Sequence, residues 1–322
     1  MFDGKILVTG PSGFIGGHIS RHFSSKGYSV QCACRSAKRV LEFPNSIEIF
    51  EDCDVKSDDN WNDAFDGINT VVHCAGISNA QEKGLNELPN YIHEINAQGT
   101  RRIAEIASLK NVKRFIFIST AKVFGEISFS GKPFNLSSAI APEDEYASSK
   151  WGAEKALLQI AQKTDLEVVI IRPAIVFGPK VSGNFLRLLK ISSKPIPLPI
   201  KGVKNKRSFL GISNLLDLIE ICVNQKSLGG EIFLAADEQS LSTSELVNAI
   251  KVGLKKYSLQ FSFPSEFLRL MARLVNKEGE MNRIIGNLEV DSSSTYSLLG
   301  WKPKNSTADE LEKTLNWYKE NF

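Results

Sequence analysis

The chain has 322 residues, of which 42% are hydrophobic and 23% are charged, a composition typical of a soluble globular protein rather than a disordered one. Its net charge of +3 comes from interspersed basic and acidic residues, so we expect neither a nucleic-acid-binding surface nor insertion into a membrane. The length exceeds that of most single domains, and we therefore expect two unequal lobes.

The cysteines and histidines predict neither disulfides nor a metal site. The cysteines are odd in number and lie mostly in apolar runs, and no pair of them has the spacing of metal ligands. No apolar run approaches the roughly 18 residues that span a membrane, and no apolar leader is expected. We therefore expect a cytoplasmic protein with reduced thiols at Cys32, Cys34, Cys53, Cys74 and Cys222.

The first motif is a glycine-rich turn between an expected strand, Lys5–Thr9, and an expected helix. This order of strand, turn and helix is typical of a dinucleotide site, in which the helix N-terminus offers free N–H groups to the phosphates. The first glycine permits the turn, the second lets the backbone approach the pyrophosphate, and the third lets helix and strand pack closely. The candidate contacts in this turn are Gly10, Ser12, Gly13, Phe14, Ile15 and Gly16.

The end of the next expected strand, residues 28–34, bears on the choice of cofactor. An acidic residue there binds the ribose 2'-hydroxyl of NAD, whereas a basic residue suits the 2'-phosphate of NADP. Arg35 and Ser36 stand at this place, so the sequence favours NADP. The alternative is that Arg35 stacks beside the adenine or faces solvent, which leaves NAD possible.

Expected strands and helices alternate as far as Arg172, which predicts an α/β fold with a Rossmann-type, doubly wound parallel sheet. The pattern then changes, and we expect a smaller C-terminal α/β lobe. Residues 1–178 with roughly 205–236 are predicted to form a dinucleotide-binding domain, and residues 179–204 with 237–322 a substrate-binding lobe. Residues 264–275 predict an amphipathic helix that faces the core, with a membrane-surface patch as the less favoured alternative.

A tyrosine and a lysine stand four residues apart, at Tyr146 and Lys150, in an expected helix over residues 146–162. Residues at this spacing share one face of a helix. A nearby ammonium lowers the pKa of a phenol from its ordinary value of about 10, so Tyr146 could act as acid or base at neutral pH. The alternative is an ordinary exposed helix face.

Together these features resemble the extended short-chain dehydrogenase/reductase family along nearly the whole chain. The branch most similar to this chain acts on nucleotide-activated sugars, and residues 119–126 and 205–209 resemble a subgroup associated with bacterial O-antigen and capsule sugar synthesis. The resemblance implies further cofactor contacts at Asp54, Val55, Cys74, Ala75, Gly76, Asn96, Ser119, Pro173 and Val176. From the sequence alone, Asn96 is either a buried clamp on the backbone or part of a solvated face.

Carried over residue by residue, the resemblance implies a catalytic centre of Thr120, Tyr146 and Lys150. Thr120 would hold the substrate oxygen, Tyr146 would transfer the proton, and Lys150 would bind the nicotinamide ribose and lower the pKa of Tyr146. The implied substrate contacts are Ser78, Thr120, Lys122, Val123, Asn184, Arg207 and Arg283. Arg207 would bind the substrate pyrophosphate, which suits a planar guanidinium. A solvated loop position is the equal alternative for Lys122.

The resemblance implies an NAD(P)-dependent oxidoreductase that acts at C4 of a UDP-sugar. Because Arg35 favours NADP, we place first a reductase of a 4-keto sugar in surface-polysaccharide synthesis. The alternative is a 4-epimerase of a UDP-sugar of the glucose or N-acetylglucosamine type, with retained NAD. A non-catalytic NADP-sensing module is disfavoured because all three residues of the implied catalytic centre are present.

Two further expectations follow from the resemblance. Ala121 stands where dehydratases of the family carry an Asp–Glu pair, which disfavours a dehydratase. In the family the helices that bear Asn96 and Tyr146 often pair with their symmetry mates, so we expect a homodimer with a nucleotide-sugar substrate.

Overall fold

The computed structural model describes residues 4–40, 42–57, 60–78, 90–256, 261, 273 and 278–322. The chain divides into two compact units. The first unit holds Met1–Val123, Pro142–Pro173 and Leu216–Phe233, and the second holds Phe124–Ala141, Ala174–Leu215 and Leu234–Phe322. The division into a dinucleotide-binding domain and a substrate-binding lobe stays a prediction. The helix expected over residues 264–275 lies outside the described residues, apart from residue 273.

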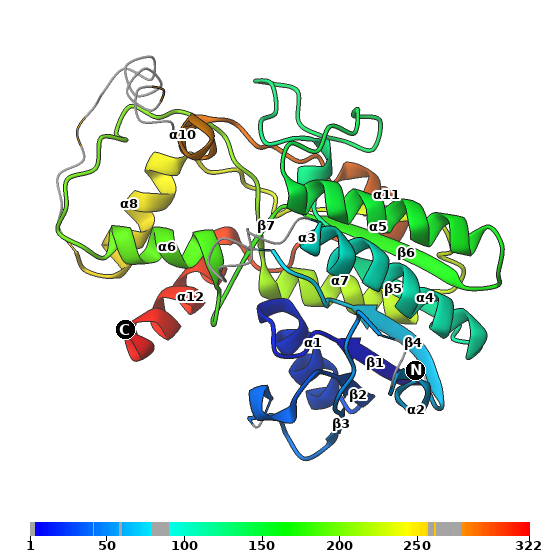
Figure 1. The fold of residues 1–322 in the computed structure, drawn as a ribbon. Coiled ribbons are helices and arrows are strands. Elements are labelled where there is room, and N and C mark those ends of the chain that lie inside the picture. The colour runs from blue at the N-terminus through cyan, green and yellow to red at the C-terminus, as the bar shows by residue number, and fades with distance from the viewer. Residues whose placement is uncertain are drawn as a thin grey trace. The chain divides into compact units, whose positions relative to one another are not determined.

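A seven-stranded parallel sheet confirms the predicted doubly wound α/β fold (Figure 1). The strand order is β3-β2-β1-β4-β5-β6-β9, so the chain changes direction of winding between β1 and β4. In such sheets ligands bind at the carboxyl ends of the strands beside this switch point. The strands are β1 (Lys5–Thr9), β2 (Ser29–Ala33), β3 (Ile47–Phe50), β4 (Ile68–His73), β5 (Arg114–Ile118), β6 (Glu167–Pro173) and β9 (Ile232–Ala235).

Helices connect these strands (Figure 1). Residues 91–109 are helical throughout, with a π-helical turn between a short first helix and the last ten residues. The helical segments are α1 (Phe14–Ser25), η1 (Ala37–Arg39), α2 (Trp61–Ala64), α3 (Tyr91–His93), η3 (Glu94–Gly99), α4 (Thr100–Leu109), η4 (Ala121–Phe124), α5 (Glu145–Ala161) and α7 (Ile212–Asn224).

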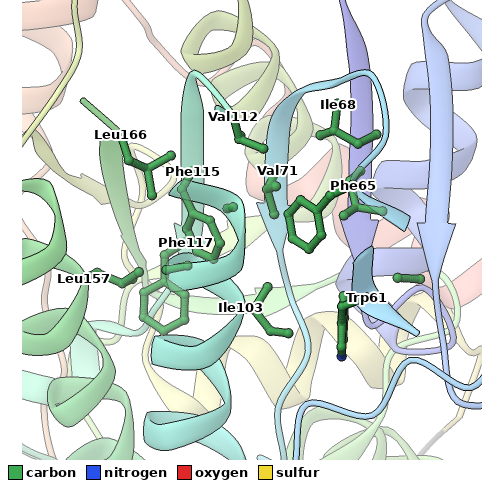
Figure 2. Close-up of a cluster of buried hydrophobic side chains, with 14 of the residues drawn as sticks. Trp61, Phe65, Ile68, Val71, Ile103, Val112, Phe115, Phe117, Leu157 and Leu166 are labelled. Carbon is green, nitrogen blue, oxygen red and sulfur yellow. The ribbon is translucent and has the colours of Figure 1, made fainter. Parts of the chain in front are cut away.

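A hydrophobic cluster joins one face of the sheet to α2, α4 and α5 (Figure 2). Side chains alternate between the two faces of a strand, so Phe115 and Phe117 of β5 point into this cluster together. They pack with Ile103 of α4 and Leu157 of α5, and each of these side chains is fully buried. The cluster fixes α5, and with it the predicted tyrosine and lysine, against the strands.

A buried cation ties the sequence-distant segment 222–225 to the sheet. Arg114 begins β5 and is only 4% exposed. Its Nη1 donates to the main-chain carbonyls of Cys222 and Gln225, at 2.7 and 2.6 Å, and its guanidinium is ion-paired with Glu167 of β6. The end of α7 therefore completes the hydrogen bonding of a residue more than a hundred positions earlier in the chain.

The second unit contains a two-stranded parallel sheet of β7 (Ile175–Phe177) and β8 (Phe209–Gly211). Phe185 stacks on Phe177 with ring centroids 5.0 Å apart, and Phe209 meets both rings edge-on. The helices of this unit are α6 (Gly183–Ser192), α8 (Thr243–Gly253), α10 (Glu278–Ile285), α11 (Ser293–Leu299) and α12 (Thr307–Asn321). Capping boxes, Ser242 with Glu245 and Ser306 with Asp309, start α8 and α12.

The prediction of unpaired cysteines is confirmed, because all five are free thiols. In the part of the chain that the structure describes, no helix is both long and apolar enough to cross a membrane.

Candidate active site

The glycine turn after β1 fits the phosphates of a dinucleotide. Gly10 has a φ of +69°, and a Cβ there would lie 2.8 Å from the backbone of Ala75. A Cβ on Gly16 would lie 2.3 Å from the carbonyl oxygen of Gly10, so neither position accommodates a side chain. Helix α1 starts after Gly13, and no side chain caps its first N–H groups. These N–H groups can bind an anion, as the sequence predicts.

A buried histidine fixes the ends of β1 and β4 beside this turn. Thr9 Oγ1 accepts hydrogen bonds from two N–H groups of the Cys74–Ala75 segment, each at 3.2 Å, so its own hydrogen is donated to His73 Nδ1 at 2.8 Å. The His73 Nε2–H then donates to Thr100 Oγ1 at 2.9 Å, and Thr100 donates to the Asn96 carbonyl at 2.7 Å. Burial lowers the pKa of His73 to about 3. The imidazole is therefore a neutral link between the glycine turn and η3.

Asn96 is a buried clamp on the backbone, one of the two alternatives left open by the sequence. Its Oδ1 accepts from the Ile77 N–H at 2.7 Å, and its Nδ2 donates to the Ile77 carbonyl at 3.0 Å. The same Nδ2 donates to Ser149 Oγ at 2.9 Å, and Ser149 donates to the carbonyl of Tyr146 at 2.7 Å. A Cβ on Gly76 would lie 2.9 Å from Asn96 Oδ1. The π-helical turn η3 thus joins the segment after β4 to helix α5.

The three predicted catalytic side chains all belong to the first unit. Thr120 follows β5, Tyr146 lies in the first turn of α5, and Lys150 lies one turn later on the same face. Lys150 is only 5% exposed, and its Nζ lies 4.3 Å from the centroid of the Phe117 ring. The same Nζ lies 3.9 Å from the position that a Cβ on Gly76 would take. Lys150 therefore reaches the segment that faces the glycine turn.

Burial is the main influence on the pKa of Tyr146 in this structure. Burial raises it above the ordinary value for a phenol, and the carboxylate of Asp144 adds to that effect. Burial also lowers the pKa of Lys150 to about 8, and the Lys150 ammonium lies over the ring of Phe117. Lys150 is not among the groups that shift the pKa of Tyr146 here, and its lowering of that pKa stays a prediction.

Replacing Lys150 with methionine should increase the free energy of unfolding at pH 7, by up to about 3 kcal/mol. The folded protein holds the Lys150 pKa at about 8, below the 10.5 of an exposed lysine. Between these two values the unfolded chain binds more protons than the folded one, so the stability of the wild type rises with pH in that window. Below pH 8 the full cost of burying the ammonium remains.

Urea unfolding of the wild type and K150M at pH 7 and pH 10 checks this expectation. The difference in the free energy of unfolding between K150M and the wild type should be largest at pH 7 and should shrink towards pH 10. A difference that is the same at both pH values would contradict the role of the buried ammonium.

Lys122 joins the loop of Thr120 to the helix of Tyr146. Its ammonium forms an ion pair with Asp144, the N-cap of α5, whose carboxylate also accepts from the Ala147 N–H at 2.7 Å. The Lys122 N–H donates to Thr120 Oγ1 at 3.3 Å. The alternative of a merely solvated lysine is wrong because of this ion pair, and a contact with the substrate stays a prediction.

A buried carboxylate lies behind the catalytic side chains. Glu154, one turn after Lys150 on α5, is fully buried. Its two oxygens accept from Arg172 at 2.6 to 3.2 Å, and the hydroxyl of Ser119 also donates to it. Arg172 is 3% exposed. This pair connects β5, α5 and β6, so it fixes the strand end that carries Thr120 against the helix that carries Tyr146.

Arg207 and Arg283, the two arginines predicted to contact the substrate, both belong to the second unit. Arg207 is 8% exposed, and its Nη1 donates to the Gly286 carbonyl at 3.0 Å, which also accepts from Asn205 Nδ2 at 2.8 Å. Arg283 forms a bidentate pair with Glu126, at 2.8 and 3.1 Å. Burial lowers the pKa of Arg207 to about 10, an effect that Glu126 partly opposes. Arg207 therefore stays charged at neutral pH, as binding a phosphate requires.

The remaining predicted contacts are divided between the two units. Those of the first unit that are exposed or half-buried are Ser12, Phe14, Ile15, Arg35, Ser36, Asp54, Val55 and Ser78. Pro173 ends β6, and Val123 is fully buried. Val176 in β7 and the exposed Asn184 at the start of α6 belong to the second unit. Among the described residues, no group of three or more His, Cys, Asp or Glu side chains is arranged to hold a metal ion.

Comparison with known proteins identifies the family. The chain matches the model of the NAD dependent epimerase/dehydratase family over residues 6–236. It is 37% identical to the UDP-glucose 4-epimerase of Vibrio cholerae over 312 residues, which are 96% of this chain and 94% of that protein. The chain belongs to this family. This membership confirms the resemblance seen in the sequence and makes the protein an enzyme of the epimerase/dehydratase family.

Other relatives agree with this assignment to the epimerase/dehydratase family. The N-acetyl-alpha-D-glucosaminyl-diphospho-ditrans,octacis-undecaprenol 4-epimerase of Escherichia coli O157:H7 is 26% identical, over 78% of this chain and 73% of that protein. Among solved structures, the UDP-glucose 4-epimerase of Thermotoga maritima superposes with a TM-score of 0.80 at 19% identity, covering 98% of this chain and 99% of that chain.

The UDP-glucuronic acid 4-epimerase of Bacillus cereus, solved with UDP-glucuronic acid and NAD, gives a TM-score of 0.79 at 21% identity, covering 99% of this chain and 100% of that chain. Both likenesses to solved structures support the same Rossmann-type fold.

Three supporting carboxylates in this member of the epimerase/dehydratase family were not predicted from the sequence. Glu154 follows Lys150 by four residues, so the spacing could have placed it on the same helix face. Asp144 immediately precedes α5, where an acidic residue is a common N-cap. Glu126 has no local signal, because its partner Arg283 lies 157 residues later in the chain.

Proposed function

We propose that the chain is an NAD-dependent 4-epimerase of a UDP-linked hexose. The observation that carries the proposal is the 37% identity to the Vibrio cholerae UDP-glucose 4-epimerase along nearly the full length of both proteins. The geometry of the first unit supports it, because Thr120, Tyr146 and Lys150 lie on elements joined to the glycine turn. The 4-epimerase, which was the alternative in the sequence analysis, is therefore the first candidate here, and the reductase that Arg35 favours is the second.

The chemistry needs a hydride acceptor and a group that moves one proton. NAD, when bound at the glycine turn, would supply hydride acceptance at C4 and return the hydride to the opposite face of the sugar. Tyr146 would take the proton of the 4-hydroxyl group and later give it back, so the overall reaction consumes no reductant. Thr120 would hold the same oxygen by a hydrogen bond.

Lys150 would serve Tyr146 as a fixed positive charge. It lies one turn from Tyr146 on the same helix face, and its pKa of about 8 keeps most of it charged at pH 7. Its charge favours the phenolate when the phenol has given up its proton. Its ammonium would also bind the hydroxyl groups of the nicotinamide ribose.

The second unit would bind the substrate diphosphate. Arg207 and Arg283 supply two guanidinium groups, and the Gly286 carbonyl and Glu126 orient them. Asn184 and Lys122 would contact other parts of the nucleotide sugar. We further infer a cytoplasmic homodimer that serves surface-polysaccharide synthesis, in line with the lipid-linked sugar named for the Escherichia coli relative.

A second candidate is the NADP-dependent reductase of a UDP-linked 4-keto sugar. Arg35, exposed at the end of β2, favours it because a guanidinium suits a 2'-phosphate. The reductase uses the same Thr120, Tyr146 and Lys150, so the reacting groups do not separate the two candidates. The choice of cofactor and the net consumption of a reductant separate the two candidates.

One experiment tests both candidates. The purified protein is denatured and the released dinucleotide identified by mass spectrometry, and the native protein is incubated with UDP-glucose and with UDP-N-acetylglucosamine without added cofactor. The epimerase should release NAD and convert one of the substrates to a mixture of 4-epimers. No interconversion, together with NADPH oxidation in the presence of a UDP-4-keto sugar, would overturn the proposal in favour of the reductase.

A further inference from the structure

A carboxylate lies at the turn where the sequence rule for cofactor choice finds only Arg35. Glu51 follows β3, and its Oε1 accepts a hydrogen bond from the Ala37 N–H at 2.5 Å. Ala37 stands two residues after Arg35 and begins the short helix η1. Glu51 is therefore distant from Arg35 in sequence but bound to the same turn after β2.

An irregularity in the β2–β3 pairing puts Glu51 in this place. The Cys34 N–H donates to the Phe50 carbonyl at 2.9 Å, and the Cys53 N–H donates to the Cys34 carbonyl at 3.1 Å. The residues between these two bonds, Glu51 and Asp52, therefore bulge out of the pairing, and Asp52 has a φ of +57°. The bulge directs the chain after β3 across the carboxyl end of β2.

The charge of Glu51 acts on the end of β2. Burial is the main cause of the raised pKa of the Cys34 thiol, and the carboxylates of Glu51 and Asp52 add to it. In the described part of the chain Glu51 makes no ion pair, so its charge is not neutralised by a neighbouring side chain. The effect of Glu51 on the pKa of Cys34 and its hydrogen bond from the Ala37 N–H both place this carboxylate at the end of β2.

We propose that Glu51 is a specificity-determining residue that selects NAD over NADP, an inference that rests on the proposed NAD-dependent function. In this fold the ribose 2'-position of the cofactor lies over the end of the second strand. A carboxylate there accepts a hydrogen bond from a 2'-hydroxyl and repels a 2'-phosphate. Glu51 also accepts the hydrogen bond of the Ala37 N–H, so this donor is not open to a phosphate.

Arg35 opposes this selection only weakly. Its side chain is exposed and makes no hydrogen bond or ion pair with any described residue, so binding a phosphate would cost the entropy of ordering a long side chain. Glu51, in contrast, is already held by the Ala37 N–H. The fixed carboxylate therefore outweighs the solvated guanidinium in the choice of cofactor.

Titration calorimetry with NAD+ and with NADP+ on nucleotide-free protein tests the proposal through binding rather than turnover. The wild type should bind NAD+ more tightly, and Glu51→Gln should shift the ratio of the two dissociation constants towards NADP+ by about tenfold, the effect of one carboxylate near a phosphate in water. Glu51→Ala should shift the ratio in the same direction.

Glu48→Gln is the matched control. Glu48 lies in β3 itself, three residues or about 10 Å before Glu51, and forms an ion pair with Lys5 at 2.6 Å. Its loss removes the same charge but should leave the ratio within about twofold, because screening weakens its interaction at about one Debye length and Lys5 already offsets the charge. A ratio in both Glu51 variants equal to that of the control, or a wild type that prefers NADP+, would overturn the proposal. NAD+ preference without 4-epimerase activity would instead refute the proposed function and leave the role of Glu51 standing.

Discussion

Tyr146→Phe should lower kcat for 4-epimerisation by about a thousandfold, within the range expected for the loss of a general acid–base group. The variant lacks only the phenolic oxygen that would carry the proton. The fold around it should persist, because Asp144 still caps α5 through the Ala147 N–H and Ser149 bonds to the main-chain carbonyl of residue 146, which the substitution retains. The dissociation constant for NAD+ should therefore change by no more than about twofold. Initial rates of UDP-sugar interconversion and calorimetric titration with NAD+ measure the two quantities.

Tyr28→Phe provides the control for this substitution. Its hydroxyl accepts a hydrogen bond from Asn224 Nδ2 at 2.8 Å, and Tyr28 comes from the amino end of β2, opposite the end that meets the glycine turn. The rate of this variant should match the wild type. If Tyr146→Phe kept more than a tenth of the wild-type kcat, the assignment of proton transfer to Tyr146 would fail.

Arg172→Met should reduce the free energy of unfolding by about 3–5 kcal/mol, the usual cost of leaving one partner of a buried ion pair alone. Glu154 is fully buried and accepts from Arg172 at three distances between 2.6 and 3.2 Å. Without the guanidinium, its carboxylate keeps the Ser119 hydroxyl as a donor but loses its ion-pair partner. Urea unfolding at pH 7 measures the loss.

Two further variants separate the charge from the packing. The double variant Glu154→Met with Arg172→Met removes both charges of this pair, so it should be more stable than Arg172→Met alone. Arg101→Met removes an exposed arginine whose partner Glu105 lies four residues later at 2.8 Å, and it should cost no more than about 0.5 kcal/mol. Equal losses in Arg172→Met and Arg101→Met would show that burial does not set the cost.

The features predicted correctly are those that local sequence encodes. The strand, glycine turn and helix at residues 5–25 are read from neighbouring residues, and the alternation of strands and helices then predicts the parallel sheet. Tyr146 and Lys150 share a helix face because four residues make about one turn. Asp144 follows the same local logic, although it was not singled out.

The features missed from the sequence depend on burial and on distant partners. The burial that raises the pKa of Tyr146 and lowers that of Lys150 is not revealed by their spacing. The carboxylate at the end of β2 comes from Glu51 through a bulge in the next strand, so a rule that examines only the residues after β2 finds Arg35 alone. Side chains that meet only in three dimensions need the structure.

The partners of Arg114 have a consequence for how the chain is made. When the ribosome has translated β6, Arg114 and Glu167 have been synthesised. The carbonyls of Cys222 and Gln225, which also bind the Arg114 guanidinium, have not. At that stage β9 is absent as well, and β6 is an open edge that can pair with other strands. Synthesis then continues through Ala174–Leu215, which belong to the second unit. The first unit therefore cannot complete its sheet or the hydrogen bonds of Arg114 until α7 and β9 have been synthesised.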